Sequence, residues 1–239
     1  KNLRSFELHS GLCPKSSQSL MLALEKSKSL RKFSLKCGHI DDDSAEYVVS
    51  ALGAHQNLRD LKLFFRNRNG DGESNGKKWI IALGNILQNC LPKLRLLSLS
   101  YNNICDEGAS GLGEALSKNR KLKKLDICGN TCITSISWSA LLRGISNSVS
   151  LEDIRFSYTE FGNIDEVVIG FANALINNKS LKTLYTNSVN ITARGWYALA
   201  NVLCDKSSLE SIYNSNHTLQ SVIGCEGIPD NLALYLSMN

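Results

Sequence analysis

Long hydrophobic runs are absent from this chain, and their absence excludes one class of protein. No apolar stretch approaches the roughly 18–20 residues that cross a bilayer. The longest candidate, Trp79 to Leu87, is much shorter and falls where we expect a helix. The amino end also lacks the basic, apolar and small-residue order of a secretory signal. The sequence therefore predicts no membrane association.

Paired cysteines and clustered histidines are also missing. The 8 cysteines include no Cys-x-x-Cys pair, and the 4 histidines are far apart in the sequence. We predict no metal site and no cofactor, and we expect His55, near a helix end, to be solvated. Scattered thiols favour a reducing, cytoplasmic compartment. Three glycosylation sequons, at Asn178, Asn190 and Asn216, point toward secretion instead.

No group of residues forms a recognisable catalytic centre. Residues 67–72 imitate the start of a calcium-binding loop, but Lys78 stands where a bidentate glutamate is required. Gly76-Lys77 imitates a phosphate-binding loop, but Asp71 replaces the first glycine of that motif. We therefore predict that the protein is not an enzyme.

A repeated leucine phrase of the form Leu-x-x-Leu-x-Leu organises the sequence instead. Its eight copies, some with substitutions, begin at Leu3, Leu30, Leu58, Leu94, Leu122, Leu151, Leu181 and Leu209. The intervals between them are 27, 28, 36, 28, 29, 30 and 28 residues. A near-constant period in this range is typical of a solenoid, in which each unit buries its apolar face only against its neighbours.

Each phrase alternates apolar and polar residues as a half-buried strand does, and a helical pattern follows it. The helices are expected at about 17–26, 42–54, 78–89, 106–116, 137–146, 165–176 and 192–203. Because a helix is wider than a strand, a stack of such units must curve. The predicted fold class is α/β, a horseshoe-shaped solenoid of about eight repeats with a parallel concave sheet and convex helices.

Residues 94–116, LRLLSLSYNNICDEGASGLGEAL, resemble ribonuclease-inhibitor-type leucine-rich repeats. That family has an asparagine at the ninth position of the repeat, which survives here only as Asn102 and Asn130. The resemblance implies an incomplete ladder of buried asparagines. Thr186 and Asn214 replace apolar residues at the sixth position, so we expect the core to thin toward the carboxyl end.

The uninterrupted repeat predicts one leucine-rich-repeat domain over residues 1–239. Because the chain begins at Lys1 inside a repeat, we expect it to be a fragment of a longer protein. Residues 66–78, rich in Gly, Asn and charge, are expected to form a mobile loop insertion. Residues 225–239 are expected to form an irregular end, in which Pro229 stands at a possible helix start.

The third, fifth and seventh residues of each phrase should face the concave side of the sheet. The predicted partner-binding residues are charged, aromatic or amide members of this set: Lys32, Lys36, Lys62, Phe64, Asp126, Arg155, Tyr185, Asn187 and Tyr213. Tyrosine among small polar neighbours is typical of recognition surfaces, because a rigid amphipathic ring provides contact area at little entropic cost.

These features predict a non-catalytic scaffold that binds a protein partner, of open identity, on its concave face. The resembled family includes an inhibitor of a basic enzyme, a GTPase activator for Ran and the sensor arms of innate immune receptors. One alternative is therefore a Ran-type GTPase-activating protein, with Arg66 or Arg155 as its exposed arginine. Another is a binder of an acidic partner or of nucleic acid.

Charge bears on the last alternative. Residues 1–120 carry 18 Lys and Arg against 12 Asp and Glu, whereas residues 121–239 carry 9 against 10. This bias is weaker than the dense basic stripe of nucleic-acid-binding surfaces, so nucleic acid is the less favoured partner.

Overall fold

The computed structural model describes residues 3–9, 11–12, 14–38, 40–65, 77–156, 164–186, 191–224 and 227–239. The strands are β1 (Ser5–His9), β2 (Lys32–Cys37), β3 (Asp60–Phe65), β4 (Leu96–Ser98), β5 (Lys124–Asp126), β6 (Asp153–Arg155), β7 (Thr183–Tyr185) and β8 (Ser221–Ile223). The helices are α1 (Pro14–Glu25), α2 (Asp42–Leu52), α3 (Lys77–Asn89), α4 (Asp106–Lys118), α5 (Ser135–Asn147), α6 (Ile164–Asn177), α7 (Ala193–Leu203), α8 (Leu209–Asn214) and α9 (Asp230–Met238).

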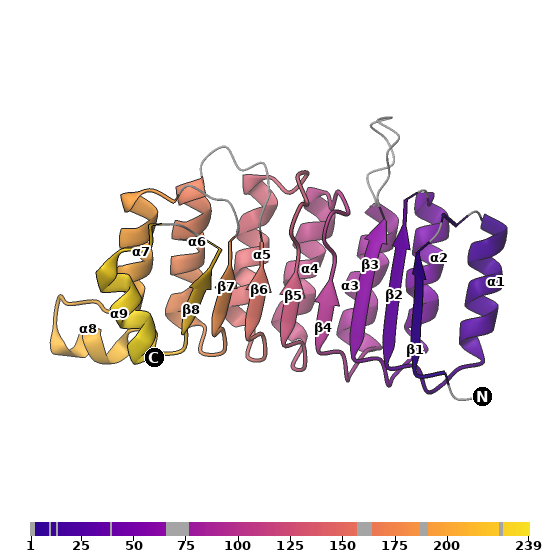
Figure 1. The fold of residues 1–239 in the computed structure, drawn as a ribbon, viewed down its shortest axis with the longest axis horizontal. Coiled ribbons are helices and arrows are strands. Elements are labelled where there is room, and N and C mark those ends of the chain that lie inside the picture. Colours follow the sequence, from indigo (N-terminus) through magenta and orange to yellow (C-terminus); the bar gives the residue numbers. More distant parts are fainter. Residues whose placement is uncertain are drawn as a thin grey trace.

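The strands form one parallel sheet in the order β1 to β8, and α1 to α7 form a second layer along it (Figure 1). The core lies between the layers. Leu61, Leu97 and Leu125, from the middle of three leucine phrases, are at most 1% exposed. The predicted α/β solenoid is therefore confirmed, and the seven long helices lie within a few residues of their predicted bounds.

The starts of α5 and α7 are anchored to the repeat that precedes each of them. The Asp106 carboxylate, in the first turn of α4, accepts hydrogen bonds from the Thr134 backbone N–H (2.8 Å) and hydroxyl (2.7 Å) just before α5. Asp165, in the first turn of α6, accepts the same pair of bonds from Thr192 before α7. A first-turn carboxylate thus stabilises its own helix dipole and caps the next helix.

The asparagines at the ninth repeat position form the expected short ladder. Asn102 accepts a hydrogen bond from the Phe65 backbone N–H (2.6 Å) and donates to the Leu63 carbonyl (2.8 Å). Asn130 accepts from the backbone N–H groups of Asn102 and Ile104, both at 3.1 Å. Each side chain satisfies the buried turn of the preceding repeat, which no apolar side chain can do.

A second ladder, which the sequence analysis missed, lies where each helix returns to the sheet. Its members stand three residues before the first leucine of a phrase and are all buried: Asn119, Ser148, Asn178 and Asn216. Asn178, for example, donates to the Ile145 and Ser148 carbonyls at 2.7 and 3.0 Å. Its carbonyl oxygen accepts from the Leu181 backbone N–H at 2.7 Å.

This ladder bears on the glycosylation sequons. Asn178 and Asn216 are each 1% exposed, and in each side chain Nδ2 donates and Oδ1 accepts hydrogen bonds. Neither is available to a glycan in the folded protein. Asn190 lies outside the described residues.

The prediction for the eighth repeat was wrong. The phrase at Leu209 forms helix α8, and Leu209 itself is 87% exposed. The last strand, β8, instead follows Leu219, which is fully buried. The physical reason is the second ladder: Asn216 stands three residues before Leu219, as Asn178 does before Leu181. The repeat period alone favoured Leu209 as the start of the last strand. The buried amide of Asn216 instead specifies that the chain returns to the sheet at Leu219.

The expected thinning of the core is not observed either. Thr186 is fully buried, and Asn214 belongs to α8 rather than to a strand. Leu219, Leu232 and Leu236 continue the core to the end of the chain.

The structure describes most of one of the two segments expected to lie outside the regular repeats, and only a small part of the other. The end expected to be irregular, 225–239, contains α9, which begins immediately after Pro229. Of the 66–78 insertion, 66–76 lie outside the described residues. Lys77 and Lys78 form the first turn of α3, where Lys78 pairs with Asp43.

His55 is buried, contrary to the expectation of a solvated side chain. It is 1% exposed and occupies the second-ladder position of its repeat, three residues before Leu58. Its Nδ1 has no hydrogen-bond partner. Burial lowers the pKa of the imidazole below its ordinary value, and a hydrogen bond to the Ser27 backbone opposes this shift in part.

We expect Asn216→Ala to lower the free energy of unfolding by about 1–3 kcal/mol, because it removes the hydrogen bonds of four backbone groups, three of them buried. Asn173→Ala, at an exposed position of α6, is the matched control and should change stability little. Urea denaturation of both variants measures the difference. Equal stabilities would mean that the second ladder does not hold the repeats together.

Stability should also fall in acid because of His55. Its folded pKa is lowered, so the unfolded chain binds the proton more readily, and folding free energy is lost as pH falls below about 6.5. His55→Asn places the ladder's own residue there and should flatten this part of the profile. Thermal melts of wild type and variant between pH 7.5 and 5 provide the check. Parallel profiles would contradict the assignment.

Candidate protein-binding surface

The parallel register collects equivalent side chains into rows across the exposed face of the sheet. The middle row runs through Glu7, Ser34, Lys62, Ser98, Asp126, Arg155, Tyr185 and Ile223. The residues between them along β2 to β8 are buried in the core, and Phe6 and Leu8 of β1 are partly buried against it. Four of the predicted binding residues, Lys62, Asp126, Arg155 and Tyr185, therefore share one row.

A basic aromatic cluster lies beside this row near the carboxyl ends of the strands. Lys36 and Phe64 are register partners, and the Lys36 Nζ lies 5.3 Å from the centroid of the Phe64 ring. The Phe64 ring lies 6.2 Å from that of Tyr101 in the next repeat. A cation over an aromatic face is attracted by the ring quadrupole, so the three side chains hold one another in place.

Tyr101 is held in an unusual backbone conformation. Its φ is +57°, a left-handed value that is rare for a bulky residue. Its ring covers Gly129, the equivalent residue of the following repeat, where φ is +70°. A Cβ atom at Gly129 would meet the ring at 2.3 Å, so glycine is required there for Tyr101 to keep this position.

A second cation–aromatic pair joins Arg155 to Tyr185. The Arg155 guanidinium carbon lies 4.3 Å from the centroid of the Tyr185 ring on the adjacent strand. On the other side, Asp126 faces Arg155 in the register and accepts a hydrogen bond from the Cys128 backbone N–H at 3.1 Å. Charge of both signs and one aromatic ring thus alternate over three strands.

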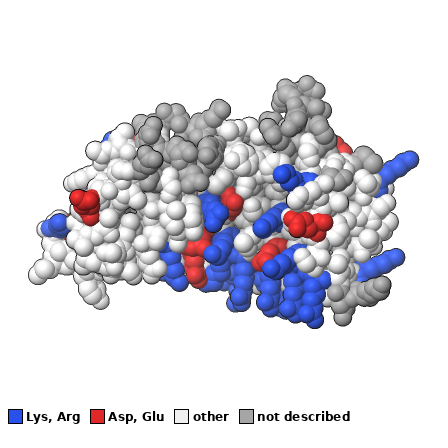
Figure 2. Space-filling view, viewed as in Figure 1, with Lys and Arg blue, Asp and Glu red and all other residues white. Residues whose placement is uncertain are grey.

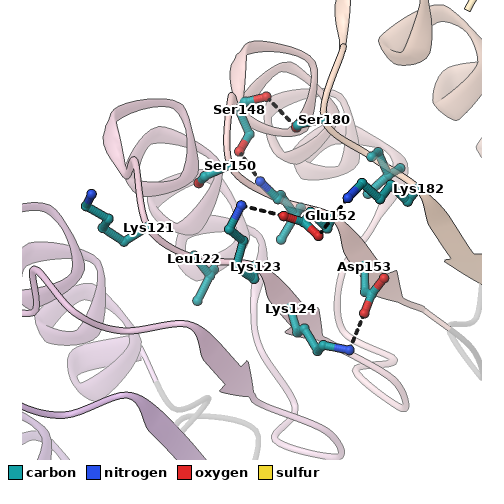
Figure 3. A network of polar contacts seen from close by, with 12 residues as sticks. Lys121, Leu122, Lys123, Lys124, Ser148, Ser150, Glu152, Asp153, Ser180 and Lys182 are labelled. Carbon is teal, nitrogen blue, oxygen red and sulfur yellow. Dashed lines mark hydrogen bonds and ion pairs between the residues drawn. The ribbon is translucent and has the colours of Figure 1, made fainter. Parts of the chain in front are cut away.

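Ion pairs neutralise much of the charge at the start of the strands. Lys124 pairs with Asp153 at 2.5 Å, and that hydrogen bond raises the pKa of Lys124 (Figure 3). Lys32 pairs more loosely with Asp60, at 3.5 Å. The exposed sheet is therefore a mixture of basic, acidic and uncharged patches (Figure 2).

One predicted site residue, Tyr213, does not lie on this surface. Tyr213 lies on α8, away from the sheet, and is 83% exposed, because the eighth strand forms ten residues later than predicted. Ile223, 42% exposed at the end of the middle row, occupies the place assigned to Tyr213. The Asn216-x-x-Leu219 spacing was the signal that locates Ile223. Asn187 lies outside the described residues.

Among the residues that the structure describes, no group of three or more His, Cys, Asp or Glu side chains could hold a metal ion. No helix in the described ranges is long and apolar enough to cross a membrane.

The fold and the repeats define the chain as a leucine-rich repeat protein. A family model described as Leucine Rich repeat matches residues 90–113, within the repeat whose sequence is most regular. Protein NLRC5 of Ictalurus punctatus is 33% identical over 194 residues, which cover 81% of this chain. The chain spans about a tenth of that relative's length, 10%.

Solved structures share the architecture at low sequence identity. Leiomodin-1 Actin-Binding Site 2 superposes with a TM-score of 0.51 at 18% identity, covering 66% of this chain and 85% of that one. The tropomodulin C-terminal domain of Caenorhabditis elegans gives a TM-score of 0.52 at 13% identity, covering 66% of this chain and 90% of that one. At these identities the likeness concerns the fold.

We expect Gly129→Ala to lower stability by about 1–2 kcal/mol through its left-handed backbone, and to displace the Tyr101 ring as well. Gly38→Ala, where an added Cβ meets nothing within 4 Å, is the control and should be nearly neutral. Denaturant titration measures stability. Retention of the wild-type value by Gly129→Ala would show that Tyr101 does not depend on this glycine.

Proposed function

We propose that this chain is a non-catalytic protein-interaction scaffold that binds a folded protein partner on its concave sheet. The observation that carries the proposal is the pair of cation–aromatic groups on that sheet, Lys36 with Phe64 and Tyr101, and Arg155 with Tyr185. Aromatic and arginine side chains that already hold each other in place lose little entropy on binding, and such residues dominate the energy of protein interfaces.

The architecture supports the same proposal. Each repeat adds one strand to a continuous surface, so a partner is contacted over several repeats without any change in the core. The fold is shared with Leiomodin-1 Actin-Binding Site 2, which is named for binding another protein, and this supports protein as the kind of ligand. The exposed or half-buried thiols of Cys90, Cys105, Cys132 and Cys204 form no disulfide, which supports a reducing compartment, the cytoplasm in our proposal.

The Ran-type alternative receives less support from the surface. Arg155, one of the two arginines suggested for that role, stacks on Tyr185, an arrangement typical of a contact residue rather than of an extended arginine finger. Arg66 lies outside the described residues.

A capture experiment with matched variants tests the scaffold proposal. Phe64→Ala/Tyr185→Ala should lose, by tenfold or more, proteins that wild type retains after mild cross-linking, because truncating an interface anchor costs roughly 2 kcal/mol or more. Tyr213→Ala removes an equally large exposed ring from α8, off the sheet, and serves as the control. Quantitative mass spectrometry of the captured proteins gives the readout. A partner lost equally from both variants, or from neither, would contradict binding on the concave sheet.

A further inference from the structure

The edge at which the strands begin carries a row of equivalent basic side chains. The Arg31 backbone N–H donates to the Arg4 carbonyl at 2.8 Å, Arg59 donates to Arg31 at 2.8 Å, and Arg95 donates to Arg59 at 2.7 Å. These bonds place the four residues at one level of successive repeats, so their backbones are about 4.8 Å apart. All four side chains are exposed. We call Arg4, Arg31, Arg59 and Arg95 the arginine ladder.

The same backbone row continues through the second half of the chain, but there its charge is compensated. It consists of Lys123, Glu152, Lys182 and Gln220. Glu152 forms ion pairs with Lys123 and with Lys182, the latter at 3.2 Å (Figure 3). The hydrogen bond from Lys123 and the one from Lys182 lower the pKa of Glu152, so it remains ionised between them.

The arginine ladder has no such compensation. Within the described part of the chain, none of its four guanidinium groups forms a salt bridge. Lys28, Lys93 and Lys121 lie in the turns beside it and are exposed. Lys and Arg gather visibly along this rim below β1 to β5 (Figure 2). Like charges on adjacent strands repel one another, and a bound anionic partner relieves that repulsion.

We propose that the arginine ladder binds an acidic helix of a protein partner, laid across the strands along this rim. A helix that bears one carboxylate per turn presents negative charge about every 5.4 Å. An extended peptide presents same-face side chains about every 6.7 Å. Across three intervals the ladder spans about 14 Å, against about 16 Å for the helix and 20 Å for the strand. The helix therefore stays within reach of all four arginines.

The chemistry of the rim favours a carboxylate-bearing protein over a single-stranded nucleic acid. Arginine matches a carboxylate through two parallel N–H donors. Surfaces for single strands also offer aromatic rings on which bases stack. The turns that carry the ladder, residues 26–31, 56–59 and 91–95, contain no aromatic residue.

This site is separate from the concave sheet. The ladder precedes the strands, whereas the cation–aromatic groups lie on the strand faces or beyond the strand ends. The inference does not rest on the proposed function, and either can fail while the other holds.

The test uses a labelled alanine-rich helical peptide with glutamate at positions i, i+4, i+7 and i+11, and fluorescence anisotropy at low salt. Arg31→Gln/Arg59→Gln/Arg95→Gln should bind this peptide roughly tenfold more weakly than wild type, because each exposed ion pair contributes only a fraction of a tenfold change. The matched control, Lys15→Gln/Arg143→Gln/Lys179→Gln, removes equal charge from exposed positions elsewhere and should change affinity less than about twofold.

Two further probes make the result specific. A peptide isomer with its glutamates spread around the helix should bind more weakly than the striped peptide. A 15-nucleotide thymidine strand should bind more weakly than the striped peptide. Equal weakening by both triple variants, equal binding of the two isomers, or tighter ladder-dependent binding of the thymidine strand would each overturn the proposal. So would a ladder variant that melts at lower temperature but binds the peptide as wild type does, since the arginines would then contribute to stability alone.

Discussion

The hydrogen bond that each repeat donates to the repeat before it, at the residue preceding each strand, sets the geometry of the rest of the molecule. The bond recurs from Arg31 to Gln220 at 2.7–2.8 Å, and the next residue shares the same acceptor at 2.9–3.1 Å. Because it fixes the register, every position of the repeat becomes a straight row. The leucines form the core row, the buried polar residues form the two ladders, and the exposed residues form the candidate binding surface.

One consequence is that a solenoid amplifies single-residue choices. A lone arginine on a surface has little effect, but the same residue at the same position of four successive repeats produces a charged edge. A buried asparagine behaves likewise: Asn178 satisfies the turn of the preceding repeat, and Asn216 satisfies the carbonyl of Asn178 in turn. Each repeat therefore contributes one residue to each row. Contacts between adjacent repeats determine both the stability of the solenoid and the surface that we propose for recognition.

The sequence predicted the features that depend on apolar period. Strands β1 to β7 and helices α1 to α7 were found because leucines at fixed spacing leave one way to bury them. The prediction for the eighth repeat was wrong because either Leu209 or Leu219 could begin its strand. Asn216 favours Leu219, because its side chain satisfies buried backbone groups just before that leucine. The prediction of a solvated His55 was wrong for a related reason. Its burial follows from its place in the second ladder, which the hydrophobic pattern does not reveal.

The candidate surfaces also contain features that the apolar pattern predicts and features that it does not. Facing directions on the strands follow from alternation, so Lys36, Arg155 and Tyr185 were located correctly. The cation–aromatic contacts depend on side-chain distances between repeats, which no spacing rule provides. The arginine ladder escaped notice because its residues lie in turns just before the strands, outside the alternating pattern.

Most of the uncompensated arginines precede the longer strands of the sheet. Strands β2 and β3, which follow Arg31 and Arg59, are six residues long, whereas β4 to β8 are three residues each. Longer pairing contributes more backbone hydrogen bonds against the repulsion of adjacent charges. In the second half of the chain the strands are shorter, and strand pairing contributes fewer hydrogen bonds. There Glu152 forms ion pairs with Lys123 and Lys182 and so removes the repulsion between them. Three of the four uncompensated arginines, Arg4, Arg31 and Arg59, thus precede strands of five or six residues, and the ion pairs of Glu152 compensate the charge where the strands are shorter.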